Sequence, residues 1–530
     1  MTQETSLLRA SASPALGTAL SRATGLIRVA AMAAALGQGG VSDGFNLANT
    51  APNLIYELVL GGVLSSTLVP VFVRAEGESA DAARERASVV ASVTLVALVV
   101  LSVAAVAISP ALVGIIPATT DGAAIRSEIA GPLLALLLPQ ILFYGVTSVG
   151  TAILHAHRRF AVAAFAPVLT NVITTGIFIA VAIVTDTAED VRQQSVILLL
   201  GLGTTAGVAA MAICVALGLR SGGIRLQWKF QPRHPVIGRI GRLAGWTIGY
   251  VAANQIALLV VLAVAAGQGD GVVTAYQTAF IFFQLPHGLL AVSIMTSATP
   301  ELARAVANEQ PIRFAKRFRE GSLVMLALMV PAAVGLAVLA HPLVELLLER
   351  GRFTPADTDR TAAVLTGLAV GLPAFSAYLF TLRVFTARGD TRTPFGCNVI
   401  QNATNIALVL IVAASTGTSP VGLGLAYSGS YLLAAIVTSA RAGQVIPGLL
   451  DRSWWTPVVR VAVMGAVLAI VLLAARAALG GLGADGPLVE VIVLTVVGAA
   501  GVALAVPRLG IDGFDEVIER VRRGTARRGP

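Results

Sequence analysis

The stretch Ala15–Leu36, ALGTALSRATGLIRVAAMAAAL, decides the fold, because it is apolar and long enough to cross a bilayer yet carries two arginines. About 20 residues rising 1.5 Å each span a hydrocarbon core of roughly 30 Å. A guanidinium at the bilayer centre costs at least about 2.5 kcal/mol, so we expect Arg22 and Arg28 to face a watery cavity rather than lipid. Arginine keeps its proton and its planar group suits phosphate, so this helix indicates a cavity for an anion.

The polar side chains of this stretch fall on one face of a helix. The stripe spans about 120° of arc and consists of Thr18, Ser21, Arg22, Gly25 and Arg28. The alternative is that both arginines extend to the inner interface or pair with an acid for stability. Arg22 is near enough to the end of the span to do so, whereas Arg28 lies near mid-depth.

The composition of the 530 residues predicts an all-α integral membrane protein. Charged residues make up 12% of the chain and hydrophobic residues 56%, and the mean hydropathy is +0.82. Soluble domains carry about 25% charged residues. The net charge of +9 comes without a basic domain containing interleaved aromatics, so no nucleic-acid partner is expected. Cys214 and Cys397 both lie in apolar segments and are expected to be core residues.

A hydropathy scan predicts fourteen transmembrane helices. Their approximate ranges are 15–36, 47–73, 87–116, 129–154, 160–184, 195–219, 240–266, 272–303, 318–339, 361–387, 394–414, 420–445, 456–479 and 487–506. When the amino terminus is placed in the cytoplasm, most of the 37 Lys and Arg residues fall in the inner segments. The positive-inside rule therefore predicts an even number of spans, with both termini cytoplasmic.

A weak internal repeat divides the chain into two halves. Gly37-Gln38-Gly39 recurs as Gly267-Gln268-Gly269, and Asn171 recurs as Asn402, each about 230 residues further on. An offset of six spans predicts two parallel repeats around a central site. The predicted parts are an amino-terminal lobe at 1–220, a basic cytoplasmic linker at 221–242, a carboxy-terminal lobe at 243–450, two further helices at 451–507 and a basic tail at 508–530.

The second predicted span combines polar residues with residues that allow bending. Asn53 and Glu57 are candidate site residues, and Glu57 is the natural ion-pair partner for an arginine of the first span, either structurally or in exchange against substrate. Asp43 precedes this span and is either a site residue or a solvated loop acid. Proline removes a backbone donor and glycine allows close helix approach. The predicted hinge or gating positions are Pro52, Gly61, Gly62 and Pro70.

The second half offers amides rather than charges. Gln284 is a candidate substrate contact in the eighth span. Asn254, Asn398 and Asn402 could present oxygens to Na⁺ or another coupling cation, with interhelical hydrogen bonding as the alternative. The sequence has no phosphate-binding P-loop, no HExxH motif and no nucleophile elbow, so we expect a non-enzymatic protein without a cofactor or metal centre.

Four segments carry a resemblance to a known family. They are SRATGLIR (21–28), SDGFNLANTAPNLIYELVLGGVLSSTLVPVFVRA (42–75), ILHAHRRFAVAAFAPVLTN (153–171) and QLPHGLLAVSIMTSATPELARA (284–305). With these segments the chain resembles the MurJ/MviN family of lipid II flippases, within the MOP exporter superfamily. The resemblance implies two six-helix lobes in a V around a cationic cavity, and a groove for a polyprenyl tail on the last two helices. It implies that Arg22 and Arg28 bind pyrophosphate and that Asp43 is the family's acidic residue before span two. Many members have charged residues where this chain has Tyr56, Ile281 and Gln284.

The function that the resemblance implies is transport of a lipid-linked precursor. Undecaprenyl-linked peptidoglycan precursor, lipid II, would pass from the inner to the outer leaflet of the bacterial cell membrane by alternating access, driven by the membrane potential or a cation gradient. Expected partners are lipid II, membrane lipids and the cell-wall synthesis machinery. The alternatives are an exporter of another polyprenyl-linked glycan, a cation-coupled drug antiporter, which would need a carboxylate-rich cavity, and a non-transporting cell-wall scaffold.

Overall fold

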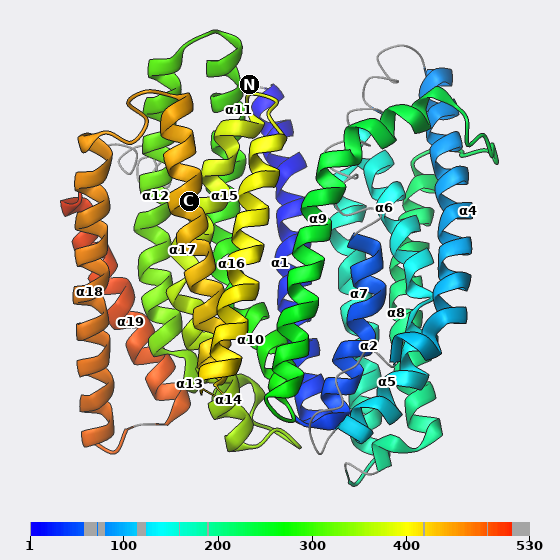
Figure 1. Cartoon of the computed structure of the whole chain (residues 1–530), viewed down its shortest axis with the longest axis horizontal. Helices are drawn as coiled ribbons and strands as arrows, with labels where there is room; N and C mark the ends of the chain where they lie inside the picture. Colours follow the sequence, from blue (N-terminus) through cyan, green and yellow to red (C-terminus); the bar gives the residue numbers. More distant parts are fainter. Residues whose placement is uncertain are drawn as a thin grey trace. The chain divides into compact units, whose positions relative to one another are not determined.

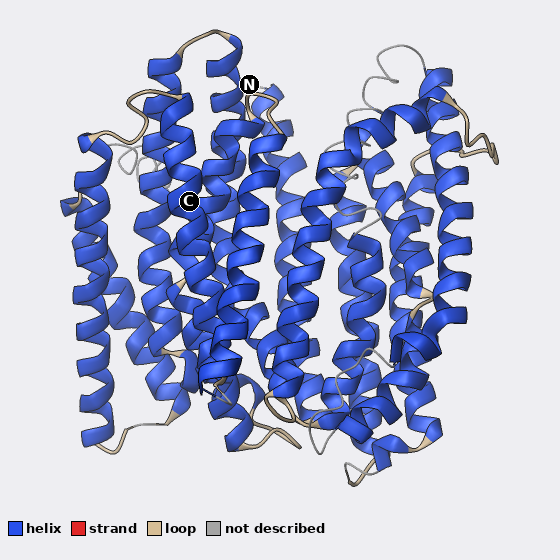
Figure 2. Cartoon of the chain, in the orientation of Figure 1, coloured by secondary structure: helices blue, strands red, loops and turns tan. Residues whose placement is uncertain are grey.

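The computed structural model describes residues 2–57, 72, 80–113, 123–157, 159–187, 190–416, 419–484 and 486–510. Within these ranges the chain forms helices and short connections and contains no strand, as Figures 1 and 2 show. The all-α prediction is confirmed. The predicted hinge positions Gly61, Gly62 and Pro70 lie outside the described residues.

Thirteen of the fourteen predicted spans have a counterpart in the structure. Eleven described helices are long and apolar enough to cross a membrane, and two bent helix pairs bring the number to thirteen. The bends measure 42° between Glu128–Leu137 and Gln140–Ala156, and 45° between Pro355–Val370 and Leu372–Thr386. Pro139 stands at the first break and Gly371 at the second, where a missing donor or side chain interrupts the helix. The remaining span, 47–73, lies largely outside the description and stays a prediction.

The first compact unit contains Met1–Thr274 and Leu348–Asp357. Its helices are α1 (Thr2–Leu36), α2 (Gly40–Tyr56), α4 (Ala80–Val113), α5 (Ala123–Leu137), α6 (Gln140–Ala156), α7 (Phe160–Val184), α8 (Gln194–Ser221) and α9 (Pro235–Gly267), with a short turn η3 (Asp190–Arg192). Small residues let these helices pack closely. A Cβ added at Gly17 of α1 would lie 2.8 Å from the Cβ of Ala164 on α7.

The second compact unit contains Ala275–Leu347 and Thr358–Pro530. Its elements are α10 (Val272–Pro286), the π-helical turn η4 (His287–Ala291), α11 (Val292–Ala307), α12 (Pro311–Val338), α13 (Ala340–Leu348), α14 (Pro355–Val370), α15 (Leu372–Thr386), α16 (Arg392–Thr416), α17 (Pro420–Val445), α18 (Arg452–Gly481), α19 (Pro487–Ala505) and η5 (Val506–Arg508). Packing groups α9 with the first unit, whereas the sequence repeat places it at the start of the second lobe. The predicted lobe boundaries follow the repeat and stay a prediction.

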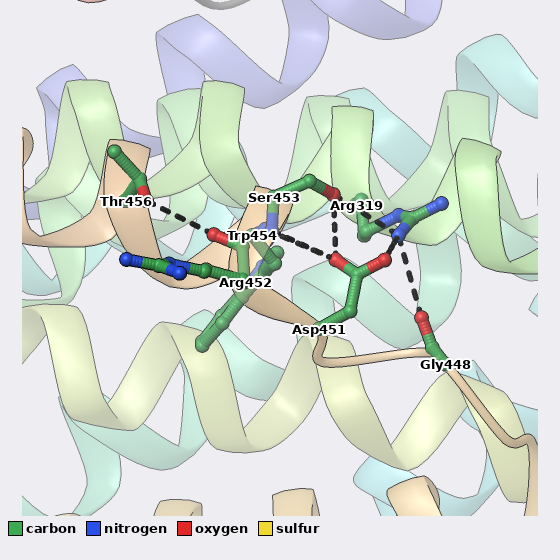
Figure 3. A network of polar contacts seen from close by, with 7 residues as sticks. All are labelled: Arg319, Gly448, Asp451, Arg452, Ser453, Trp454 and Thr456. Carbon is green, nitrogen blue, oxygen red and sulfur yellow. Dashed lines mark hydrogen bonds and ion pairs between the residues drawn. The ribbon is translucent and has the colours of Figure 1, made fainter.

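Helix α18 is attached to α12 by a polar network at its amino-terminal end (Figure 3). Asp451 caps α18 by accepting hydrogen bonds from the backbone nitrogens of Ser453 at 3.1 Å and Trp454 at 3.3 Å, and its other oxygen pairs with Arg319 of α12. The indole nitrogen of Trp454 donates to Ser322 of α12 at 2.9 Å. Hydrogen bonds from Ser453 and Arg319 lower the pKa of Asp451 to about 2. The cap and the ion pair therefore fasten the start of the last helix pair to the second unit.

We predict that Asp451→Ala lowers the thermal midpoint of the purified protein in detergent. Loss of an N-cap costs about 1 kcal/mol, and Asp451→Asn should fall in between because it keeps a cap but loses the ion pair. Because folding lowers this pKa, the contribution is complete above the ordinary value of about 4 and is lost as the pH falls toward 2. Arg452→Gln is the control, since its side chain takes no part in the network. Equal midpoints for Asp451→Ala and Arg452→Gln would contradict the assignment.

Candidate functional site

The polar stripe of α1 packs beside α7. Asn171 of α7 donates its amide to the carbonyl oxygen of Ser21 at 2.9 Å and to the hydroxyl of Thr24 at 3.2 Å. A Cβ at Gly25 would lie 3.6 Å from the amide nitrogen of Asn171, which is an ordinary van der Waals contact, so α1 and α7 lie close together here. Asn171 therefore holds the middle of α1 in a fixed position while the arginine side chains remain available.

Arg22 and Arg28 are partly buried and not fully satisfied. The Nε atom of each arginine is buried and has no hydrogen-bond partner among the described residues. Within the same part of the chain, neither arginine forms an ion pair with a carboxylate. A buried donor on a charged group that lacks a partner costs free energy that an anion could recover. The stripe is therefore suited to an anionic ligand.

Arg28 lies beside a group of polar aromatic side chains. It lies close enough to Tyr144 of α6 to interact with it electrostatically, and the Tyr144 hydroxyl is near the side chain of Asn53 on α2. The Tyr144 ring packs against that of Tyr56 with centroids 5.2 Å apart, and the Tyr56 hydroxyl lies 3.1 Å from that of Ser148. This arrangement supplies hydroxyl and amide groups near one cation, and the Glu57 carboxylate lies close enough to Tyr56 to interact with it electrostatically.

Sequence reasoning selected Arg28 and Asn53 for this group but missed Tyr144 and Ser148. Their signal was present, because they stand one helical turn apart in a predicted span and so share a face of the helix. Glu57 ends the described part of the second predicted span, and no ion pair of the described residues joins it to either arginine. The predicted exchange of this carboxylate stays a prediction. Pro52 lies inside α2 and is buried there.

Asp43 has no exposed surface, so the solvated-loop alternative is wrong. Its carboxylate accepts hydrogen bonds from the backbone nitrogens of Gly271 at 2.8 Å and Thr274 at 2.9 Å, and from the Thr274 hydroxyl at 2.7 Å. Asn46 adds a bond to the same hydroxyl at 3.0 Å. A carboxylate at the positive end of a helix satisfies unpaired N–H groups and complements the helix dipole. Asp43 therefore ties the start of α2 to the first turn of α10, whose residues up to Thr274 belong to the first unit.

Arg352 makes a second connection at the ends of helices, and sequence reasoning missed it. Its guanidinium donates to the carbonyl oxygen of Ala35 at the end of α1, at 2.6 Å, and to that of Thr185 just past α7, at 2.7 Å. The last carbonyls of a helix lack partners within the helix, so one planar cation caps two helices at once. Gly37 and Gly351 adopt positive φ angles of 63° and 62° where the segment after α1 meets the segment that contains Arg352. The signal was an arginine in a predicted outer loop, where arginine is scarce.

The remaining predicted residues are distributed over both units. Gln284 is exposed near the end of α10, in the second unit. Asn398 and Asn402 are buried one turn apart on α16, where the Asn402 amide donates to the Asn398 carbonyl at 3.0 Å. Asn254 belongs to α9 of the first unit. In the described ranges no cluster of three or more His, Cys, Asp and Glu side chains could hold a metal ion. A shared cation site stays a prediction.

Comparison with known proteins identifies relatives along most of the chain. The family model described as lipid II flippase MurJ matches residues 32–493. A probable lipid II flippase MurJ of Rhizobium meliloti (strain 1021) is 30% identical over 459 residues, which cover 85% of this chain and 83% of that protein. A lipid II flippase MurJ of Burkholderia cenocepacia is 26% identical over 77% of this chain and 79% of that protein.

Solved structures show the same fold at lower identity. A structure titled lipid II flippase MurJ in an inward closed conformation matches with a TM-score of 0.77 at 20% identity, covering 96% of this chain and all of that one. An inward-facing multidrug resistance MATE family transporter of the MOP superfamily matches with a TM-score of 0.67 at 15% identity, covering 82% of this chain and 96% of that one. Because the family model spans most of the sequence, the chain belongs to the lipid II flippase MurJ family, and it is a multi-pass membrane protein.

Proposed function

We propose that this protein moves lipid II, an undecaprenyl-pyrophosphate-linked peptidoglycan precursor, from the inner to the outer leaflet of the bacterial cell membrane by alternating access. Family membership supports the substrate class, because the relatives are named as lipid II flippases. The observation that carries the proposal is the arginine stripe of α1, whose two buried Nε atoms lack partners among the described residues. A pyrophosphate is an anion that such donors would bind.

The stripe can hold the pyrophosphate at more than one point. Arg22 and Arg28 are six residues apart on one helix face, which corresponds to about 9 Å along the axis. Guanidinium groups bind phosphate oxygens in pairs, so two arginines could hold the two phosphates or pass the group along the helix. Tyr144 and Asn53 would orient Arg28 and offer hydrogen bonds to sugar hydroxyls. Moving the charged head past these groups avoids the cost of placing it in hydrocarbon.

Opening on the outer side would require bonds at the helix ends to break. Asp43 holds the first turn of α10, and Arg352 holds the ends of α1 and α7. We assign both residues to the closed state of the outer side, with Pro52 as a bending point and the predicted hinge residues Gly61, Gly62 and Pro70 completing it. The membrane potential or a cation gradient, with Asn254, Asn398 and Asn402 as candidate ligands, would drive the cycle.

The polyprenyl tail and the head group of the lipid would contact different parts of the protein. The two helices of 451–507 would guide the polyprenyl tail, Gln284 would contact the head group, and both termini would lie in the cytoplasm near the cell-wall synthesis machinery. The cationic stripe argues against an antiporter of cationic drugs, because like charges repel. Another polyprenyl-linked glycan shares the pyrophosphate, so a transport assay must distinguish the two glycans.

We predict that Arg28→Ala abolishes the rescue of a flippase-depleted strain while the protein still reaches the membrane. A hydrogen-bonded charge is worth about 1.5–3 kcal/mol, so transport should fall at least about tenfold. The measurements are lipid II translocation in depleted cells and the membrane level of the variant. Arg388→Ala, an exposed arginine in a predicted inner loop, is the matched control and should rescue fully. Full rescue by Arg28→Ala at normal expression would overturn the assigned role.

We also predict that Asp43→Asn speeds hydrogen exchange of the segment 268–276. Both oxygens of the Asp43 carboxylate accept hydrogen bonds, three in all, from Gly271 and Thr274. The asparagine amide has one oxygen and one NH₂ group, and the NH₂ group cannot accept a bond from these N–H and O–H donors. The local opening that permits exchange in this segment should become at least about tenfold more frequent. Asp359→Asn is the control, because that carboxylate is exposed and pairs with His341 instead. Unchanged exchange in Asp43→Asn, measured by mass spectrometry, would argue against the cap as a holding contact.

A further inference from the structure

An apolar groove lies between α4, α6 and α8 of the first unit, and none of its lining residues belongs to α1. It encloses about 200 Å³. Helix α6 forms its floor with Gly145 and Gly150, α4 and α8 form its walls, and Leu226 closes one end. Of the side chains that line it, only that of Thr94 carries a polar atom. A space of this size and polarity stays free of water and is suited to a hydrocarbon chain.

The floor glycines let the walls close over α6. A Cβ added at Gly145 would lie 2.0 Å from Cδ1 of Leu98 on α4, and one added at Gly150 would lie 2.5 Å from Cγ1 of Val215 on α8. The walls therefore meet the floor without intervening side chains. Ala216 of α8 is exposed and lines the groove, so the groove is accessible beside it.

The linker after α8 crosses the end of this groove as an extended strap, residues 224–230. Its backbone nitrogens at Gln227 and Lys229 donate to the hydroxyls of Ser88 and Ser92 on α4, at 3.0 and 2.9 Å. In an extended segment alternate side chains project to the same side. The side chains that do so here are exposed by 36% at Leu226, 66% at Trp228 and 47% at Phe230. Exposed tryptophan beside basic residues is typical of the membrane–water interface. The strap thus marks the level of lipid headgroups.

Basic side chains stand at the same end of the groove walls. Arg84 precedes the lining residue Ala91 by seven positions on α4, and Arg220 follows Ala216 by four on α8, so each shares the groove face of its helix. Both are exposed. Arg84 uses its Nε to donate to the Arg225 carbonyl at 2.9 Å, and none of the described residues accepts a hydrogen bond from its terminal nitrogens. Lys229 is already paired with Glu85 at 3.2 Å. Among the described residues at this end, Asp81 and Glu85 stand against Arg84, Arg86, Arg220, Arg225 and Lys229, so their summed charge is positive.

We propose that the groove holds one acyl chain of an anionic glycerophospholipid of the inner leaflet, with the phosphate between Arg84 and Arg220. The apolar groove suits the acyl chain, and the two arginines suit the negative charge of the phosphate. The strap indicates the level of the headgroups in the membrane. This lipid is not the transported substrate. It is a bound component of the first unit that fastens α4, α6, α8 and the linker together, so the site goes beyond the proposed flippase function.

The test uses the full-length protein in lipid nanodiscs that contain a phosphatidylglycerol with a photoreactive diazirine on one acyl chain. The same probe on phosphatidylcholine is the headgroup control. After illumination, mass spectrometry should locate the phosphatidylglycerol label at 145–153 and 215–219, with much weaker label from phosphatidylcholine. Equal labelling by both probes, or label only elsewhere on the surface, would overturn the proposal. The proposal would also be overturned if undecaprenyl phosphate displaced the labelled probe and excess unlabelled phosphatidylglycerol did not.

Variants separate the chain site from the headgroup site. Ala216→Phe should fill the groove and abolish the label, whereas Leu217→Phe, one position along on the exposed side, should keep it. Arg84→Gln and Arg220→Gln should each lower phosphatidylglycerol labelling about fivefold, and Arg233→Gln in the exposed part of the linker should leave it unchanged. Unaltered labelling in Ala216→Phe, or in the double variant at Arg84 and Arg220, would refute the site. Binding alone is measured, so loss of transport would not affect this result.

Discussion

The cost of placing a guanidinium in hydrocarbon is the constraint on which the rest of this structure depends. Arginine cannot lose its proton at physiological pH, so a helix that carries Arg22 and Arg28 across a membrane needs polar surroundings or an anion. The first unit meets this need in part: Asn171 holds α1, and Tyr144 lies beside Arg28. The remaining donors are available to a ligand. Tyr56 fits the same requirement, since it packs on Tyr144 and bonds to Ser148 rather than adding a further cation.

Charged side chains elsewhere act mainly on helix ends, where backbone groups lack partners. Asp43 caps α10, Arg352 caps α1 and α7, and Asp451 caps α18 while pairing with Arg319. In a protein with so few charged residues, these contacts are among the polar interactions that join segments far apart in the sequence. They are also reversible, because each exchanges a protein hydrogen bond for one with water at a helix end. A transporter that alternates between states can use such connections as closures, whereas apolar contacts along the helices keep each unit intact.

Lipid contacts extend this division of roles. The groove between α4, α6 and α8 is apolar along its length and basic at its end, which is the polarity of an anionic phospholipid. The strap over its end comes from the linker that the sequence marks as basic. Lys229 of this linker pairs with Glu85, whereas Arg84 of α4 and Arg220 of α8 are the residues that we propose bind the headgroup. The excess of positive charge that first indicated topology can thus also select the lipids around the first unit.

The membrane class, the apolar helices and the arginine stripe could be predicted from the sequence, because apolar length and helical periodicity are local properties that one segment expresses alone. The sequence by itself also determined the family through its motifs. The folded structure was needed to show that Asp43 is a buried cap rather than a solvated acid, that Tyr144 lies near Arg28 and Asn53 while Ser148 bonds Tyr56, and that Arg352 holds two helix ends. These contacts join residues up to 317 positions apart. Hydropathy and spacing carry no information about which helices become neighbours, and that choice depends on side-chain packing between helices, small residues at their crossings and the pairing of orphan backbone groups.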